Sequence, residues 1–474
     1  MPQSDRASHL AFAVASYGRG QLRFLAPHMH SVALSHPDAT ELILWRDMPT
    51  REVAYLERAY PNAAFTPLDV AVEGRTDQRI SRKMLAWEIA CQRLADQPIC
   101  FIDTDTLVLR PLTPFLDEPF DFAFTWKDHV YPLNTGVVLV GSGRKALPLL
   151  REWAARTARI VADRDLLARA LKDSGGGDQQ ALRELIGFAN YDRTYTQTIA
   201  GQTYVLRGLP CHQLNEVRSV PITDDTYIIH YKGGWHPILL HGAPYSRHRP
   251  EETSAQMHRL WLDTKADSDR HVARGVVGHA WRTHGQAAGN AAPDPLAVAA
   301  AVCADLGVEA VLTVGSRAQD VAAAMTTRLD SAEVVPRQTA SAVAKDVRRL
   351  APRRVAVVAD AGVGPDALAS LARTLAVAEH VGALFVTVEN AAEAALAADV
   401  ADLDRTLWLP RGQGPDPDGP TVPDADASSA AGDRPDGPGL LVALGAPPLT
   451  PPASNRFAPL KRMLLPLARR LGLR

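Results

Sequence analysis

Two aspartates with the spacing of a metal site, Asp103 and Asp105, follow the apolar run 99–102 (ICFI). In an extended segment, residues two apart point to the same side, so both carboxylates can face one divalent cation. Hard oxygen ligands suit Mg²⁺ or Mn²⁺, and such an ion can neutralise a leaving diphosphate. The same pattern also fits a solvated strand end followed by a turn, because an isolated Asp-x-Asp is common.

Four further motifs follow the aspartates in a fixed order. They are 133–138 (LNTGVV), 177–180 (GDQQ), 209–215 (LPCHQLN) and 229–234 (IHYKGG). The ordered set resembles the retaining glycosyltransferases of the GT-A fold, in particular glycosyltransferase family 8, the glycogenin and lipopolysaccharide galactosyltransferase type. The resemblance spans residues 10–245. It implies a nucleotide-diphospho-sugar donor, with a UDP-sugar expected, and a Mn²⁺ or Mg²⁺ cofactor.

The resemblance implies that Asp103, Asp105 and His230 are the metal ligands, with His230 delivered from a distant strand. Imidazole is a good partner for Mn²⁺ and would complete a mixed nitrogen and oxygen shell. The alternative for His230 is a buried core histidine, because it ends the apolar run TYIIH.

Three residues are candidates for the catalytic side of the site. Asn134 offers both a donor and an acceptor to sugar hydroxyls, although Asn is also frequent in turns. Asp178 could bond donor-sugar hydroxyls or cap the helix that follows the SGGG run. The resemblance implies that the side-chain carbonyl of Gln179 faces the anomeric carbon. An amide is a poor nucleophile, so we expect it to stabilise an oxocarbenium-like transition state.

Lys232 and Gly233 follow His230 and are candidates for binding the diphosphate. The ammonium would supply positive charge, and glycine lets the backbone approach closely. The related enzymes place their lysine further along, where this chain has His236, so His236 is a second candidate with a surface histidine as the alternative.

Lys83 and Tyr17 are candidates for the nucleotide. Lys83 lies four residues before Trp87 and shares its helix face, so it could reach the diphosphate or be a solvated charge. Tyr17 follows the first apolar run and could stack on the base. Ser16 stands where the related segment carries an acidic residue, which leaves the choice of base open.

The elements around these residues predict an α/β fold. Apolar runs alternate with helix-like segments over residues 8–245, which favours a largely parallel sheet with ligands at the carboxyl ends of its strands. We expect a GT-A domain over 1–250 and a helical linker over 251–294, with a helix at 251–264. A smaller Rossmann-like α/β domain follows over 295–450, with a disordered insert at 411–438 and a basic amphipathic tail at 451–474.

The second domain resembles a degenerate methyltransferase. Gly315 is a single glycine where a cofactor loop would carry three, and no acidic residue ends the next apolar run, 332–337. We therefore expect a partner module without catalytic function. Its tail has a spacing of apolar and basic residues compatible with an anionic membrane surface, or with docking onto the body of the protein.

Charge and cysteine content narrow the class of protein. Lys and Arg number 51 against 53 Asp and Glu, so no net field favours nucleic acid. The 4 cysteines have no CxxC spacing, which excludes a disulfide framework and a thiolate zinc site and fits a reducing cytoplasm. The N-terminal residues lack a signal-peptide pattern, and no apolar stretch is long enough to span a membrane.

Taken together, the sequence favours a cytoplasmic, metal-dependent glycosyltransferase of polysaccharide biosynthesis that acts, with retention, on a glycan or lipid-linked acceptor. Two alternatives stay open. One is a catalytically inactive GT-A-like protein that binds a glycan or a partner. The other is a bifunctional glycosyltransferase–methyltransferase.

Overall fold

In the computed structural model the chain forms two compact units, Met1–Gly275 and Val276–Arg474. In the first unit and the helix that ends it, the described residues are 10–69, 76–127, 132–187, 194–215, 222–241, 245 and 251–287. In the rest of the chain they are 295–306, 308–315, 317–329, 332–339, 342–343, 346, 355–359, 381–388, 406–410 and 439–444.

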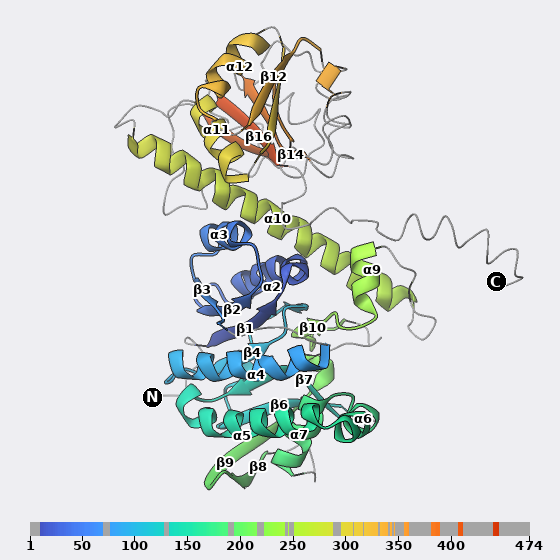
Figure 1. The fold of residues 1–474 in the computed structure, drawn as a ribbon. Helices are drawn as coiled ribbons and strands as arrows, with labels where there is room; N and C mark the ends of the chain where they lie inside the picture. Colours follow the sequence, from blue (N-terminus) through green and yellow to red (C-terminus); the bar gives the residue numbers. More distant parts are fainter. Residues whose placement is uncertain are drawn as a thin grey trace, which may run out of the picture. The chain divides into compact units, whose positions relative to one another are not determined.

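The first unit is built on an eight-stranded mixed sheet (Figure 1). Its order is β3 (Ala63–Pro67), β2 (Glu41–Arg46), β1 (Ala11–Tyr17), β4 (Ile99–Ile102), β7 (Leu133–Val140), β6 (Phe122–Trp126), β9 (Gln202–Pro210) and β8 (Thr194–Ile199). The first four strands are parallel, as predicted. Strand β7 is antiparallel to both β4 and β6, and β8 to β9, so the prediction of a largely parallel sheet is wrong for this half.

The central strands are apolar because helices cover them. All residues of β4 and β7 are buried, which is typical of strands with both faces covered. Helices α4 (Thr76–Arg93), α5 (Gly143–Ala162) and α7 (Gly177–Ile186) contribute to the main core, and α4 and α5 run alongside each other in Figure 1. Trp87 of α4 stacks on Phe101 with 4.8 Å between ring centroids and meets Trp153 of α5 edge-on at 5.6 Å.

A two-stranded ribbon next to the sheet positions the site. Strand β5 (Thr106–Val108) follows β4 closely and pairs antiparallel with β10 (Ile228–His230), with Thr106 opposite His230. A second, smaller core supports this ribbon and includes Leu107 and Ile229. It also takes residues from α2 (Leu22–Ser35), α9 (Trp235–His241) and α10 (Glu251–Ala287). The ribbon thereby brings residues from widely separated parts of the chain together.

Helix α10 is longer than the sequence predicts. The expected helix ends at residue 264, whereas α10 continues to Ala287. Within the first unit, the His271 ring nitrogen Nε2 lies 2.7 Å from the Ala59 carbonyl oxygen, close to the end of α3 (Thr50–Ala59). Gly275 also approaches Ala59, because a Cβ added at Gly275 would lie 2.8 Å from the Ala59 Cα. Contacts with α3 therefore hold the helix where its sequence pattern is weak.

The second unit contains a six-stranded sheet. Its order is β12 (Glu333–Arg337), β11 (Ala310–Val314), β13 (Val355–Ala359), β14 (Val381–Val388), β16 (Gly439–Leu444) and β15 (Thr406–Pro410). The first four strands are parallel, and β16 is antiparallel to both neighbours. Helices α11 (Pro295–Leu306) and α12 (Ala318–Thr326) accompany the sheet. A parallel sheet with helices is the α/β type expected for this part of the chain, and β16 adds an antiparallel strand to it.

The C-terminal part of the second unit contains a strand that the sequence does not predict and two segments outside the described residues. Strand β15 was not expected from the sequence, because its short TLWLP run lies next to the Pro/Gly-rich segment. The predicted disordered insert, 411–438, and the basic tail, 451–474, lie outside the described residues. In the described part of the chain, no helix combines the length and apolarity that crossing a membrane requires.

The residue that follows helix α2, His36, is a partly buried histidine with a defined proton. The His36 Nε2 atom accepts a hydrogen bond from the Leu112 backbone N–H at 2.9 Å, so this nitrogen must be unprotonated. The other ring nitrogen, Nδ1, lies 2.9 Å from the Ser35 hydroxyl. Burial lowers the pKa of His36 from 6.5 to about 4. The fold therefore requires neutral His36.

We expect this histidine to make the first unit less stable in acid. Between pH 6.5 and about 4 the unfolded chain binds a proton at His36 that the folded chain does not, so the free energy of unfolding falls as the pH falls. Replacement by an amide, His36→Gln, removes this dependence. Urea unfolding at several pH values should show the wild type losing more stability than the variant on acidification. Equal losses would contradict the assignment.

Candidate functional site

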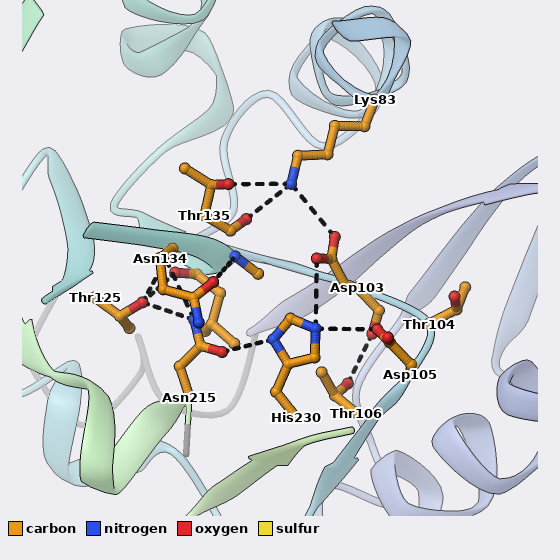
Figure 2. Close-up of polar contacts among 12 residues, drawn as sticks. Lys83, Asp103, Thr104, Asp105, Thr106, Thr125, Asn134, Thr135, Asn215 and His230 are labelled. Atoms are coloured by element: carbon orange, nitrogen blue, oxygen red, sulfur yellow. Dashed lines mark hydrogen bonds and ion pairs between the residues drawn. The ribbon is translucent and has the colours of Figure 1, made fainter. Parts of the chain in front are cut away.

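Asp103 and Asp105 occupy the short turn between β4 and β5, and backbone contacts fix that turn (Figure 2). The Asp103 N–H donates to the Gly136 carbonyl at 3.0 Å, which joins the turn to β7. The Thr106 hydroxyl donates to the Asp103 carbonyl at 2.8 Å. Asp105 is buried and Asp103 partly buried, so neither is the solvated strand end that the sequence left open.

His230 faces both carboxylates. Its Nε2 atom lies 3.1 Å from Asp105 Oδ1 and 3.8 Å from Asp103 Oδ2. One ligand atom from each residue lies within 4.8 Å of the other two. The β5–β10 pairing places the imidazole here, because His230 stands opposite the residue that follows Asp105. The three sequence-predicted metal ligands are therefore brought together.

Asn215 fixes the tautomer of His230. The Asn215 amide nitrogen donates to the Thr125 hydroxyl at 2.8 Å and to the Asn134 carbonyl at 3.2 Å, which orients the amide. Its oxygen therefore accepts from His230 Nδ1 at 2.8 Å, so the proton of the neutral ring is on Nδ1. The lone pair on Nε2 is then directed at the carboxylates, as in histidines that bind metals. Figure 2 shows the imidazole between Asn215 and the two aspartates.

These residues fit a divalent cation. Two carboxylates and one neutral imidazole are a donor set for Mn²⁺, and the oxygen atoms also suit Mg²⁺. Gly136 lies against them, and a methyl group there would overlap the ring of His230 and approach Asp103 Oδ2 to 3.2 Å. Glycine at this position therefore leaves room for the histidine in its binding orientation.

His236 is a second imidazole at Asp105. Its Nε2 atom lies 2.7 Å from Asp105 Oδ2, and its ring packs on Phe24 with 4.5 Å between centroids. Burial alone would raise the pKa of Asp105, but the charges and hydrogen bonds of His230 and His236 outweigh it and hold that pKa below its usual range. For Asp103, burial outweighs the attraction of Lys83 and raises the pKa.

Lys83 is buried beside the acidic turn and is not a solvated helix charge. Its Nζ atom lies 3.5 Å from Asp103 Oδ1 and 3.5 Å from Asp178 Oδ2. It also donates to the Thr135 carbonyl at 3.1 Å and hydroxyl at 3.3 Å, and lies 5.2 Å from the centre of the Trp87 ring. Burial would lower the pKa of Lys83, but the two carboxylates outweigh it and raise that pKa.

Asp178 joins the same network from the first turn of α7. It is buried, and its Oδ2 accepts from the Thr135 hydroxyl. Gly176 is the N-cap of this helix, so capping is not the role of Asp178. The next residue, Gln179, satisfies its side-chain amide when the nitrogen faces the carbonyl oxygens of Leu133 and Ser174. Both candidates thus lie close to the residues of β7.

Asn134 carries an unused hydrogen-bond donor. Its Oδ1 accepts from the Gly136 N–H at 3.2 Å, but its Nδ2 has no partner among the described residues although the side chain is 3% exposed. Buried amide groups are rarely left unpaired, so this donor points to a ligand. The turn role that the sequence left open does not apply, because Asn134 lies within strand β7.

The sequence also predicts roles for Lys232, Gly233 and Tyr17, whose surroundings differ. Burial lowers the pKa of Lys232, with Asp103 acting in the opposite direction. Gly233 has a φ of 60°, which favours glycine, and it is exposed. Tyr17 ends β1 and packs partly buried against the main core. Ser16 is fully buried, with its hydroxyl 3.4 Å from the Met48 sulfur.

Sequence reasoning assigned no role to Asn215, Thr135 or Thr125. Asn215 and Thr135 lie inside quoted motifs, LPCHQLN and LNTGVV, but nothing in those letters shows that an amide will orient a histidine 15 positions later. Thr125 has no motif at all. A buried polar residue within an apolar run, as in FAFTW, was the available signal.

The room left by Gly136 gives a direct test. We expect Gly136→Ala to displace His230 and weaken Mn²⁺ binding by at least about 10-fold, because the added methyl overlaps the imidazole. Isothermal titration with Mn²⁺ measures the effect. Gly20→Ala is the matched control, since a methyl there meets nothing within 4 Å. Unchanged binding in Gly136→Ala would show that His230 is not a ligand.

The chain was compared with known families, curated proteins and solved structures. No family profile and no curated protein matches the chain. Among solved structures, the glycosyltransferase GlyE of Streptococcus pneumoniae is 11% identical and covers 74% of this chain and 92% of its own, at a TM-score of 0.37. Galactosyltransferase LgtC, solved with donor and acceptor sugar analogs, is 16% identical, with coverages of 55% and 95% and a TM-score of 0.36. The bifunctional glycosyltransferase WbbM is 12% identical, with coverages of 54% and 50% and a TM-score of 0.34. All three of these solved structures are glycosyltransferases.

Proposed function

We propose that this chain is a metal-dependent glycosyltransferase that moves a sugar from a nucleotide-diphospho-sugar to a hydroxyl acceptor with retention. The observation that carries the proposal is the convergence of Asp103, Asp105 and the Nε2 atom of His230. A Mn²⁺ or Mg²⁺ ion held there would offset the charge of the departing diphosphate. An isolated binding module would have no need of this donor set beside a buried lysine.

The diphosphate is the natural occupant of the space next to these ligands. Lys232 is a candidate for direct contact with it, and the exposed, left-handed Gly233 lets the backbone approach. Lys83 pairs with Asp103 and Asp178 and holds these carboxylates in place. Tyr17 is a candidate for stacking on the nucleotide base. A UDP-sugar is the donor that we propose to test first.

The donor sugar would lie against β7 and the start of α7. The unpaired Asn134 amide is available to donate to a sugar hydroxyl. Asp178 is committed to Lys83 and Thr135, so it is better suited to binding hydroxyls than to attacking carbon. Gln179 would place an uncharged amide near the anomeric carbon. Attack by the acceptor from the face that the diphosphate leaves, with the phosphate taking the proton, would retain configuration.

The residues of the site say less about the acceptor and about the cellular compartment of the protein. A glycan or a lipid-linked acceptor is the class that we propose, and the basic tail is a candidate for contact with a membrane surface. All four cysteines are free and buried, which is compatible with a reducing cytoplasm.

The metal ligands provide the central test of this proposal. Purified full-length protein is incubated with a panel of nucleotide-sugars with and without Mn²⁺, and hydrolysis of the donor and its thermal stabilisation are followed. We expect Mn²⁺-dependent turnover that Asp105→Asn reduces by about 100-fold or more, because a charged ligand of the ion that offsets the diphosphate charge is lost.

The control for this test is Asp96→Asn, which removes an exposed carboxylate that pairs with Arg144 away from the site. It should leave turnover unchanged. A wild type that neither binds nor hydrolyses any donor would instead favour an inactive binding protein.

Lys83 provides a second test, which separates stability from turnover. Lys83→Met leaves two buried carboxylates without their cation, and we expect it to lower the free energy of unfolding by about 3 kcal/mol or more. The double variant Lys83→Met/Asp178→Asn should recover part of the lost free energy of unfolding. We expect neither the single nor the double variant to turn over the donor. Urea unfolding and donor hydrolysis measure the two effects. A single variant as stable as the wild type would contradict the network.

A further inference from the structure

Another imidazole–carboxylate pair, His28 and Glu41, joins helix α2 to strand β2. His28 of α2 is fully buried, and its Nε2 atom lies 3.2 Å from Oε1 of Glu41, the first residue of β2. The Glu41 side chain is 6% exposed. Burying a charged pair is unfavourable unless its geometry and remaining hydrogen bonds compensate, so the contacts of this pair need an explanation.

The other side of the His28 ring contacts the strand of the site. Its Nδ1 atom lies 3.2 Å from the Thr106 carbonyl and 2.9 Å from the Thr106 hydroxyl. A carbonyl only accepts, and this hydroxyl already donates to the Asp103 carbonyl. Nδ1 must therefore carry a proton and donate it to Thr106. Glu41 Oε1 then lies against Nε2, although neither atom has a hydrogen-bond partner among the described residues.

Thr106 is the residue through which His28 can act on the metal site. It follows Asp105 directly, stands opposite His230 in the β5–β10 ribbon, and holds the backbone of Asp103 through its hydroxyl. One helical turn beyond His28, the Ser31 hydroxyl accepts from the Val108 N–H at 3.0 Å. Helix α2 thus holds β5 at two points, both through buried side chains.

We propose that His28 is a positioning residue for the metal site. Its Nδ1 holds Thr106, and Thr106 sets the separation between the aspartates and His230. His28 does not contact a ligand atom of the site in the contacts described above. The inference rests on the proposed function only in that the site binds a cation, and it concerns the affinity for that ion.

The test measures the affinity of the full chain for Mn²⁺ alone, from the electron paramagnetic resonance signal of the free ion. We expect His28→Ala to weaken binding by about 10-fold, in the range found when groups that orient metal ligands are removed. His28→Asn should recover most of this loss, because the amide nitrogen can still donate to Thr106. Val32→Ala, which trims a buried apolar residue of the same helix, is the control for stability and should bind Mn²⁺ as the wild type does.

The outcomes separate the inference from the proposed function. If the wild type binds Mn²⁺ and His28→Ala stays within roughly two-fold of it, or if Val32→Ala loses as much affinity, His28 only stabilises the fold and the inference is wrong. If the wild type does not bind Mn²⁺, or binds it equally after Asp105→Asn, the proposed function fails and the inference with it. Should His28→Ala not fold, His28→Leu keeps most of the side-chain volume but cannot donate to Thr106, and the same loss of affinity is expected.

Discussion

The antiparallel pairing of β5 with β10 is the interaction on which the rest of the site depends. Asp105 and His230 are far apart in the chain, and only the register that sets His230 opposite Thr106 brings the imidazole to the carboxylates. A ribbon of two three-residue strands is marginal alone, because it offers few hydrogen bonds for the entropy it costs. The core that includes Leu107 and Ile229 therefore stabilises the geometry of the site as much as it stabilises the fold.

Charge compensation is the second constraint. Asp103, Asp105 and Asp178 lie close together in a mostly buried region, where unpaired carboxylates are costly. Lys83 compensates Asp103 and Asp178 from α4, and imidazoles meet Asp105 from two sides. With Nε2 of His230 deprotonated, as metal binding requires, the aspartate pair would retain negative charge. A site that keeps such charge after its internal ion pairs are formed is suited to a cation, and a cation there is suited to a diphosphate.

The sequence predicts the parts of this site that depend on local pattern. The spacing of Asp103 and Asp105 after an apolar run gives the acidic turn, and the order of the motifs gives the candidate partner His230. It does not predict the burial of Lys83, because a lysine on a helix is usually solvated and only the tertiary position of α4 decides otherwise. For a similar reason, the sequence does not predict that β7 is antiparallel to both β4 and β6. An apolar run such as β7 has the same composition in either direction when both faces are covered.

The second unit keeps the parallel strands typical of a nucleotide-binding sheet, but the described end of β12 carries no acidic residue. Its parallel strands β12, β11 and β13 form the kind of sheet that binds nucleotides at the carboxyl ends of its strands. Recognition of a ribose there relies on an acidic residue that accepts from the hydroxyl groups. Strand β12 instead ends in Arg337, whose guanidinium can only donate and is already paired with Asp346. The described end of β12 therefore lacks the acidic group on which such recognition relies.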